Sequence, residues 1–188
     1  THIQPHVSDF PHSVAVVIEE LSPPKVDGNE AAALDEALSS IDDAIESVLG
    51  LPRSLLSPSS QLLSYRHNEA YYNHHDCWPG TVALPDRHIT VLVYLTTVET
   101  EDGGGTHFPY LHTTVQPVAG TLLAFNNLTP RPTFTGSATN LSCSVVAGEG
   151  LCNASMLHAS LPITSKHANK LVLQRWYLTA PTPGMADT

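Results

Sequence analysis

The chain has 188 residues, of which 41% are hydrophobic, and it carries 8 basic and 18 acidic side chains for a formal net charge of −10. The acidic balance argues against a nucleic acid or an anionic membrane surface as the main partner, because both attract clustered Lys and Arg. No apolar run reaches the length of a membrane span. We expect a single domain over residues 1–188, with its core at 61–178. The chain begins at Thr1, so we expect a trimmed or processed product.

The N-terminal part predicts one strand and one helix. Residues 1–12 are polar and rich in His and Pro, as in a tail, and the β-branched run 13–20 has the length of a strand. Apolar side chains then recur at a spacing of about 3.6 residues over 31–48, which predicts an amphipathic helix that ends at Gly50. The opposite face is acidic and typical of a solvated surface. We therefore expect this helix to pack on the outside of a sheet.

From residue 61 onward, short β-rich runs alternate with turn residues. The predicted strands are 61–66, 88–95, 113–118, 121–125, 155–158 and 170–178. The runs 113–118 and 121–125 flank Ala119-Gly120 and predict a hairpin. Residues 126–153 are polar with little periodicity, which predicts a long loop; loops of this length are functional lids or disordered, and the alternative is a surface excursion with no role in binding. One helix followed by about eight short strands favours a jelly-roll β-sandwich with helical support.

A histidine and a carboxylate lie two positions apart at His74 and Asp76. In an extended segment these two side chains point the same way, and His75 points to the other side. An imidazole and a carboxylate are two of the three ligands of a 2-His-1-carboxylate Fe(II) site, which leaves open positions on the metal. The third ligand must be a distant histidine, and His158 is the best candidate. Alone, His-x-Asp is a weak signal in a chain with 11 histidines.

The cysteines and the glycosylation sequons concern the cellular compartment. Cys143 and Cys152 lie close together in a polar stretch and can form a disulfide that leaves Cys77 free; the alternative is three free thiols. Asn-x-Ser/Thr sequons occur at Asn127, Asn140 and Asn153. Together these features favour the secretory pathway, with a cytoplasmic location as the alternative.

The order of several individually weak motifs is more specific than any one of them. In chain order they are Tyr65, Tyr71, His74, Asp76, Arg87, Thr90, Gly104, Thr106 to Pro109, His158, Lys170 and Trp176. This arrangement resembles the prolyl 4-hydroxylase group of Fe(II)- and 2-oxoglutarate-dependent dioxygenases, and the resemblance runs from about Gln61 to Leu178. It implies a double-stranded β-helix, a jelly roll similar to cupins. It also implies His74, Asp76 and His158 as metal ligands, with Fe(II) and 2-oxoglutarate as cofactors; ascorbate is a further candidate.

The far carboxylate of 2-oxoglutarate needs a buried cation, and Lys170 offers one on the strand after the last ligand. Strand alternation places Lys170 and Trp176 on one face. By family position, Tyr65 and Thr106 add hydroxyl hydrogen bonds to the same carboxylate. A short insertion after His158 makes Lys166 a competitor for this role, and we prefer Lys170 because its strand continues in register to Trp176.

The candidate substrate contacts are Tyr71, Trp78, Arg87, Tyr94 and Trp176. Trp78 and Tyr94 are possible stacking partners for a proline-rich peptide, and Arg87 can bind a peptide carbonyl. The segments 77–86 and 126–153 are expected to border the iron site and to form the peptide groove.

The leading functional interpretation is an enzyme that hydroxylates a C–H bond, with prolyl residues in a peptide or protein as the substrate, and that consumes O₂ and 2-oxoglutarate to form succinate and CO₂. One alternative keeps the reaction and changes the substrate to a free amino acid or a small metabolite. Another is a non-catalytic cupin-like module that binds a metal or a ligand. The combination of His74, Asp76, His158 and Lys170 disfavours the module, since simple binding does not require a cation for a 2-oxo acid.

Overall fold

The computed structural model describes residues 16–19, 28–77, 86–135 and 142–180. Its strands are β1 (Val16–Glu19), β2 (Leu56–Tyr65), β3 (Tyr71–His74), β4 (Arg87–Tyr94), β5 (Thr106–Phe108), β6 (Thr113–Val115), β7 (Leu122–Asn126), β8 (Leu128–Thr135), β9 (Ser142–Cys152), β10 (His158–Ser160) and β11 (Lys170–Leu178). Its helices are α1 (Gly28–Leu49) and the short 3₁₀ turns η1 (Arg53–Leu55), η2 (Thr100–Asp102), η3 (Pro109–Leu111) and η4 (Ala154–Met156). No helix in these ranges combines the length and apolarity needed to cross a membrane.

Two antiparallel sheets form a jelly roll, as the sequence predicted. The larger sheet has the strand order β1-β2-β11-β4-β7, and the smaller one has the order β3-β10-β5-β6. Strand β11 lies at the centre of the larger sheet, which explains why nearly all of its side chains are buried. Because β11 carries Lys170 at its start, the centre of the sheet holds this cation in place.

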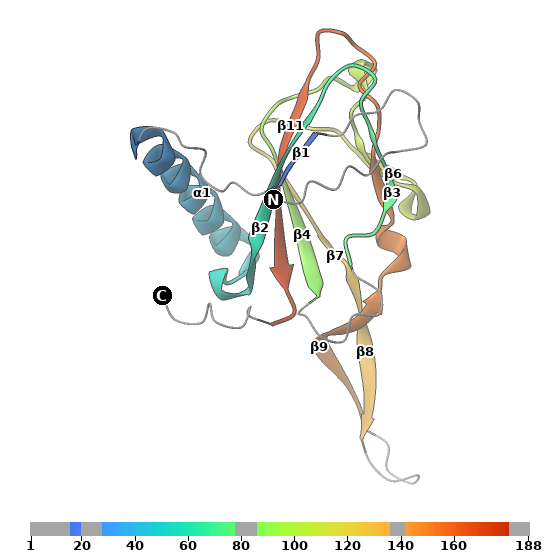
Figure 1. The fold of residues 1–188 in the computed structure, drawn as a ribbon. Helices are drawn as coiled ribbons and strands as arrows, with labels where there is room; N and C mark the ends of the chain where they lie inside the picture. The colour runs from blue at the N-terminus through green and yellow to red at the C-terminus, as the bar shows by residue number, and fades with distance from the viewer. Residues whose placement is uncertain (1–15, 20–27, 78–85, 136–141, 181–188) are drawn as a thin grey trace.

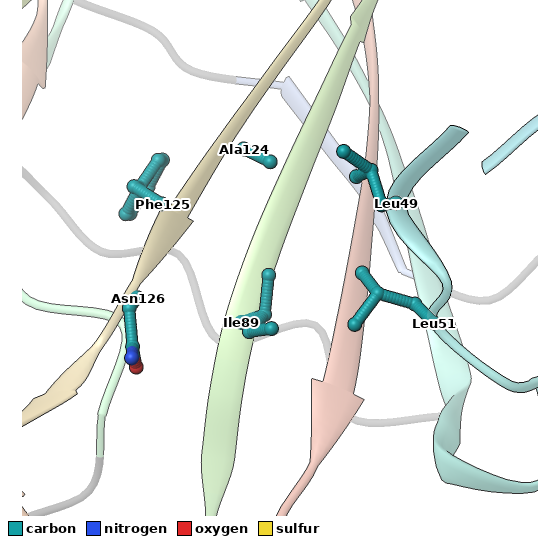
Figure 2. A pocket seen from close by; sticks show the side chains of 6 residues that line it. All are labelled: Leu49, Leu51, Ile89, Ala124, Phe125 and Asn126. Atoms are coloured by element: carbon teal, nitrogen blue, oxygen red, sulfur yellow. The ribbon is translucent and has the colours of Figure 1, made fainter. Parts of the chain in front are cut away.

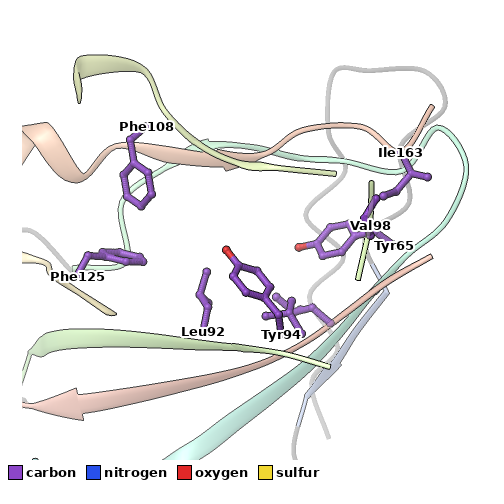
Figure 3. Close-up of a cluster of buried hydrophobic side chains, with 9 residues drawn as sticks. Tyr65, Leu92, Tyr94, Val98, Phe108, Phe125 and Ile163 are labelled. Atoms are coloured by element: carbon purple, nitrogen blue, oxygen red, sulfur yellow. The ribbon is translucent and has the colours of Figure 1, made fainter. Parts of the chain in front are cut away.

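The space between the sheets is filled by aromatic and aliphatic side chains (Figure 3). The rings of Phe108 and Phe125 meet edge to face with their centroids 5.2 Å apart, an arrangement that aromatic pairs prefer. Tyr65 and Tyr94 belong to the same cluster, and both carry a hydroxyl group into it. The core therefore combines apolar rings with the hydroxyl groups of Tyr65 and Tyr94.

Helix α1 covers the outer face of the larger sheet (Figure 1), which confirms the predicted helix and its packing. Ile45 is buried in a cluster with Val91 and Tyr177 of the sheet. The helix ends where Gly50 takes a left-handed conformation with φ of 66°, which glycine adopts without a steric cost. The backbone N–H of Gly50 donates to the carbonyl of Glu46 at 2.8 Å.

One acidic residue of the helix departs from the expected solvated face. Asp42 is only 5% exposed, and both its oxygens accept hydrogen bonds from the guanidinium group of Arg175 in β11. The same guanidinium donates to the hydroxyl of Ser60 in β2. Helical periodicity places Asp42 next to the apolar stripe, so the residue that looked like surface charge anchors the helix on the sheet.

Asp42→Ala is expected to lower the free energy of unfolding by about 3 kcal/mol, because it leaves the buried guanidinium of Arg175 without its carboxylate. The value lies at the lower end of the usual range because Ser60 still accepts one hydrogen bond. Urea denaturation followed by circular dichroism measures it. Asp43→Ala is the matched control, since the Asp43–Arg53 pair is exposed and should contribute less than about 1 kcal/mol. Equal effects of the two substitutions would contradict this assignment.

Two predictions about strand pairing were wrong. Residues 113–118 and 121–125 do not form a hairpin, because β6 pairs with β5 in the smaller sheet and β7 pairs with β4 in the larger one. Residues 126–153 are not one long loop, because β8 and β9 pair antiparallel and form a hairpin. This hairpin projects beyond the sandwich (Figure 1).

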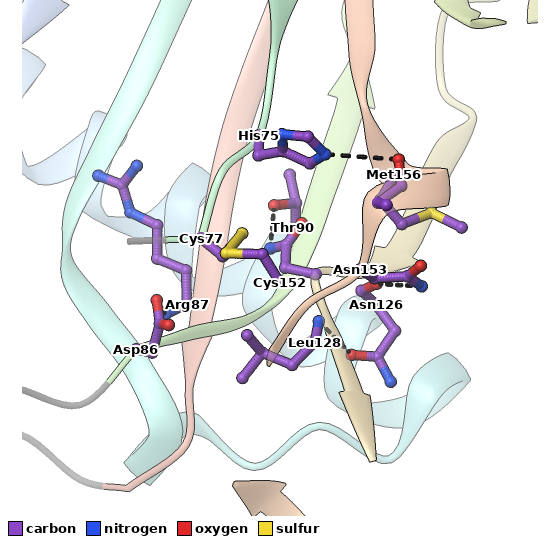
Figure 4. Close-up of a disulfide and its surroundings, with 12 residues drawn as sticks. His75, Cys77, Asp86, Arg87, Thr90, Asn126, Leu128, Cys152, Asn153 and Met156 are labelled. Carbon is purple, nitrogen blue, oxygen red and sulfur yellow. Dashed lines mark hydrogen bonds between the residues drawn. A yellow bond between two sulfur atoms is a disulfide. The ribbon is translucent and has the colours of Figure 1, made fainter. Parts of the chain in front are cut away.

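The predicted Cys143–Cys152 disulfide was also wrong. Cys152 is bonded to Cys77, with the two Cα atoms 5.8 Å apart. Cys143 and Cys152 lie near opposite ends of β9, and an extended strand separates them by on the order of 20 Å or more, whereas a disulfide requires less than about 7 Å between Cα atoms. The bond joins the end of the hairpin to the residue that follows Asp76 (Figure 4).

A pocket lies between the end of α1 and strands β4 and β7 (Figure 2). Its lining residues are Leu49, Leu51, Ile89, Ala124, Phe125 and Asn126. None of these side chains is ionisable, so the pocket offers neither the imidazole and carboxylate ligands of the expected metal site nor a cation for a carboxylate. The chemistry predicted from the sequence therefore lies elsewhere.

Candidate active site

Three potential metal ligands meet between β3 and β10. His74 ends β3 and His158 begins β10, and these two residues are direct partners across the strand pair. Asp76 lies two residues beyond the end of β3, with its Oδ1 3.5 Å from Nε2 of His74. The ligand atoms of His74, Asp76 and His158 all lie within 4.8 Å of one another. Strand pairing thus assembles the three residues that the sequence singled out.

Each histidine is held in the tautomer that a metal ligand needs. The Nδ1–H of His74 donates to the carbonyl of Tyr72 at 2.7 Å, and that of His158 donates to the carbonyl of Met156 at 2.9 Å. The Nε2 lone pairs are therefore available for a metal. Burial lowers the pKa of His158 to about 4, so this ring is neutral at physiological pH.

The carboxylate of Asp76 is oriented by three donors on one oxygen. Its Oδ2 accepts hydrogen bonds from Thr90 Oγ1 at 2.5 Å, Gln174 Nε2 at 3.0 Å and Trp176 Nε1 at 3.2 Å. Burial raises the pKa of Asp76, but the neighbouring rings of His74 and His158 and the Thr90 hydrogen bond lower it by more, so the net pKa lies below the ordinary range. Asp76 is therefore ionised, with Oδ1 left toward His74.

Lys170 is a buried cation whose hydrogen-bond partners are neutral. The side chain is 2% exposed, and its Nζ donates to the hydroxyls of Ser160 at 2.9 Å and Thr106 at 3.3 Å. Nζ also lies 5.3 Å from the ring centroid of Tyr65 and 5.8 Å from that of Tyr94. No carboxylate pairs with it among the described residues. Burial lowers the pKa of Lys170 to about 7. An anion bound beside the ammonium group would raise this pKa again.

The glycine turn before β5 places Thr106 beside Lys170. Gly103 and Gly104 have φ of 80° and 70°, values that favour glycine. A Cβ on Gly103 would lie 2.2 Å from the carbonyl oxygen of Pro162, and a Cβ on Gly105 would lie 2.4 Å from the Thr114 side chain. The turn therefore needs its glycines for close approach on both sides.

Comparison with known proteins identifies the family. Residues 60–178 match the model of the 2OG-Fe(II) oxygenase superfamily. The chain belongs to this superfamily. The oxygenase is a 2-oxoglutarate-dependent dioxygenase, and its cofactors are Fe(II) and 2-oxoglutarate.

Solved structures share the fold of this oxygenase at low sequence identity. The viral collagen prolyl hydroxylase of Paramecium bursaria Chlorella virus-1, in its 2OG complex, matches at a TM-score of 0.56 and 22% identity, over 88% of this chain and 79% of that one. The Pseudomonas putida prolyl-4-hydroxylase matches at a TM-score of 0.51 and 21% identity, over 88% of this chain and 72% of that one. The comparison with curated proteins gave no match.

The side chains of the oxygenase fit both cofactors. Two imidazole nitrogens and one carboxylate are the donor set of a non-haem Fe(II) site, and His74, Asp76 and His158 supply it. Lys170, with the hydroxyls of Ser160 and Thr106, fits the far carboxylate of 2-oxoglutarate. When bound, Fe(II) would supply the redox chemistry by which O₂, the oxidant, converts 2-oxoglutarate to succinate and CO₂ and hydroxylates a substrate.

The affinity of the oxygenase for 2-oxoglutarate is expected to fall as the pH rises above 7. The pKa of Lys170 is about 7 without a bound anion, so at higher pH binding must take up a proton, and affinity falls by up to about tenfold per pH unit. Burial raises the pKa values of Tyr65 and Tyr94, so both rings stay neutral there. Titration of Co(II)-loaded protein between pH 7 and 9 measures this slope. A flat profile would show that Lys170 remains charged throughout.

The predicted substrate residues divide into two groups. Tyr71 is half-buried, with its ring edge to face on His74 at a centroid distance of 4.2 Å, and the guanidinium of Arg87 lies 3.6 Å from the ring centroid of Trp176. Tyr94 differs from the prediction, because it is buried and donates its hydroxyl to Thr106 at 2.8 Å, at the Lys170 end. Trp176 is buried and supports Asp76. Trp78 lies outside the described residues.

Sequence reasoning missed three polar residues of the oxygenase site. Ser160 faces Lys170, and its position two residues after His158 in β10 was the available signal. Strand alternation places Gln174 on the same face of β11 as Lys170, but its hydrogen bond to Asp76 was not predicted. Asn127 donates from Nδ2 to Thr90 Oγ1 at 2.8 Å, and no local motif indicated this contact.

Proposed function

We propose that this oxygenase hydroxylates prolyl residues in a peptide or protein. The carrying observation is a half-buried rim formed by Tyr71, which packs on His74, and Arg87, which stacks on the Trp176 ring that donates to Asp76. The resemblance of the motif order to prolyl 4-hydroxylases supports this substrate class. So do the two solved structures described above, a viral collagen prolyl hydroxylase and a bacterial prolyl-4-hydroxylase.

In this proposal the residues at the rim bind and orient the substrate. Arg87 stacks on Trp176, which fixes its guanidinium plane and directs N–H donors that can bind a peptide carbonyl. The Tyr71 ring stands against His74 and offers an apolar wall for a pyrrolidine ring next to the metal. Both residues act by positioning one C–H bond beside the metal site.

We further propose that hairpin β8–β9 contributes the binding surface for the rest of the peptide. Its base lies next to the site, because Cys152 is bonded to Cys77, the neighbour of Asp76. The hairpin projects from this point (Figure 1), and in this proposal the peptide lies along it. An extended proline-rich peptide suits such a surface, since it is already ordered before it binds.

A substrate panel tests the proposed activity. The oxygenase is incubated with Fe(II), 2-oxoglutarate and ascorbate, together with proline-rich peptides, matched peptides with Ala in place of Pro, or free proline. Succinate is quantified, and mass spectrometry detects the gain of one oxygen atom. Oxygen incorporation in the proline peptides alone supports the proposal. Incorporation in free proline alone would indicate a metabolite hydroxylase, and succinate that never depends on any proline compound would contradict the proposal.

Removing the outer part of hairpin β8–β9 is expected to abolish peptide hydroxylation while uncoupled turnover of 2-oxoglutarate continues. Pro132 pairs with Val145, so deleting residues 133–144 and joining the strands by Asn-Gly keeps the base and the Cys77–Cys152 bond. The oxygenase reaction is measured as succinate formed with and without peptide. Unchanged peptide kinetics would show that the outer hairpin does not bind substrate.

We also propose that the protein works in an oxidising compartment, as the Cys77–Cys152 bond supports. The sequons give less support than expected. Asn127 is 1% exposed and its side chain is hydrogen-bonded, so it cannot carry a glycan in the folded protein. Asn140 lies outside the described residues. Peptide mapping of protein from its native source under non-reducing conditions tests the bond, and free Cys77 would contradict the proposal.

A further inference from the structure

A chain of two hydrogen bonds connects the metal-binding carboxylate to a buried asparagine. Thr90 Oγ1 donates to Asp76 Oδ2 at 2.5 Å, and Asn127 Nδ2 donates to Thr90 Oγ1 at 2.8 Å. Asn127 is 1% exposed, and its Oδ1 has no hydrogen-bond partner in the described part of the chain. Its side chain is therefore directed at Thr90 and forms no other hydrogen bond there.

Asn127 also holds the base of hairpin β8–β9 through its backbone. Its N–H donates to the carbonyl of His88 at 2.8 Å, and its carbonyl accepts from the N–H of Asn153 at 2.8 Å. Asn153 follows Cys152, whose disulfide leads back to Cys77 beside Asp76 (Figure 4). The hairpin base is thus linked to Asp76 twice, once covalently and once through the Asn127–Thr90 pair.

We propose that Asn127 is a positioning residue for Asp76, acts through Thr90, and couples the metal-binding carboxylate to the base of the hairpin. A threonine hydroxyl has one hydrogen, and Thr90 gives it to Asp76. The side-chain N–H of Asn127 donates to the oxygen of that hydroxyl. The hydroxyl hydrogen therefore stays directed at Asp76. Oδ2 is thereby held by its donors, and Oδ1 remains turned toward His74.

The inference rests on the metal role of Asp76 in the proposed function. Equilibrium binding of Co(II) to metal-free protein tests it without substrate and without turnover, so its failure is distinguishable from failure of the prolyl proposal. Supporting interactions of metal ligands typically contribute 10- to 100-fold in affinity. Thr90→Val should weaken Co(II) binding by about 10- to 100-fold, and Thr90→Ser, which keeps the hydroxyl, should restore affinity close to that of the wild type.

Asn127→Leu, of similar shape but without the donor, should weaken Co(II) binding by about tenfold and alter the visible Co(II) spectrum. In the Thr90→Val background the same substitution should not weaken Co(II) binding further, because the hydroxyl through which Asn127 acts on Asp76 is already absent. Asn126→Ala is the matched control on the neighbouring exposed residue, and it should keep wild-type affinity. Thermal unfolding of the metal-free proteins reports any general loss of stability.

Wild-type Co(II) affinity in Asn127→Leu would overturn the proposal. A further tenfold loss from Asn127→Leu in the Thr90→Val background would also overturn it, because the two residues would then act independently. If Asn127→Leu does not fold, Asn127→Ala replaces it in both comparisons, since it removes the same donor without filling the space.

Discussion

Replacing any one of His74, Asp76 and His158 with alanine is expected to abolish turnover and to leave the fold intact. Among the described residues these three side chains are the one group that could hold a metal ion, so the loss of one would leave too few ligands to hold Fe(II) in place. We expect metal affinity to fall by more than about 100-fold, beyond the usual effect of losing a supporting hydrogen bond. Succinate formation measures turnover, Co(II) titration measures affinity, and circular dichroism checks the fold.

His75→Ala is the matched control for this set. His75 is adjacent to the ligands, but its Nε2 lies 3.4 Å from the carbonyl oxygen of Ala154, and the residue is exposed. Its variant should retain most of the metal affinity and turnover. Loss of metal in His75→Ala as complete as in His74→Ala would mean that the ligand set has been misassigned.

Lys170→Ala is expected to weaken 2-oxoglutarate binding by about 3–5 kcal/mol, the usual effect of removing one partner from a buried charge pair. This corresponds to roughly 150- to 4,000-fold in affinity. The large effect follows from burial. Because Lys170 is only 2% exposed, bulk water does not solvate a carboxylate bound beside it once the ammonium group is removed. The measurement is a 2-oxoglutarate titration of the Co(II)-loaded variant, with metal affinity determined separately.

Lys166→Ala is the control for Lys170, because the two lysines competed for this role in the sequence. Lys166 is exposed, and the variant should bind 2-oxoglutarate as the wild type does. Equal 2-oxoglutarate affinities in Lys170→Ala and the wild type would remove Lys170 from the site, whatever the result for Lys166.

The sequence predicted those parts of the oxygenase that depend on local periodicity. The 3.6-residue pattern defined α1, and strand alternation placed Lys170 and Trp176 on one face of β11. His74 and Asp76 converge as expected, although β3 ends at His74 and Asp76 lies just beyond it. Local pattern and motif order predicted the three candidate ligands, and the pairing of β3 with β10 brings His158 beside His74.

The features that the sequence did not predict depend on contacts between distant segments. The turn at Gly120 does not determine how β6 and β7 pair. Tertiary packing places them in different sheets, β6 beside β5 and β7 beside β4. The disulfide partner of Cys152 is likewise set by the fold, which brings it to Cys77. Asp42 looked solvated because its partner, Arg175, lies at the far end of the chain. The low periodicity of residues 126–153 concealed β8 and β9.

The most direct test of the central claim is a crystal structure of the oxygenase with Mn(II), a redox-stable substitute for Fe(II), and 2-oxoglutarate. We expect one metal ion bound by Nε2 of His74, Oδ1 of Asp76 and Nε2 of His158, with the far carboxylate of 2-oxoglutarate on Nζ of Lys170. A metal held by other residues, or a 2-oxoglutarate carboxylate that does not contact Lys170, would contradict the account.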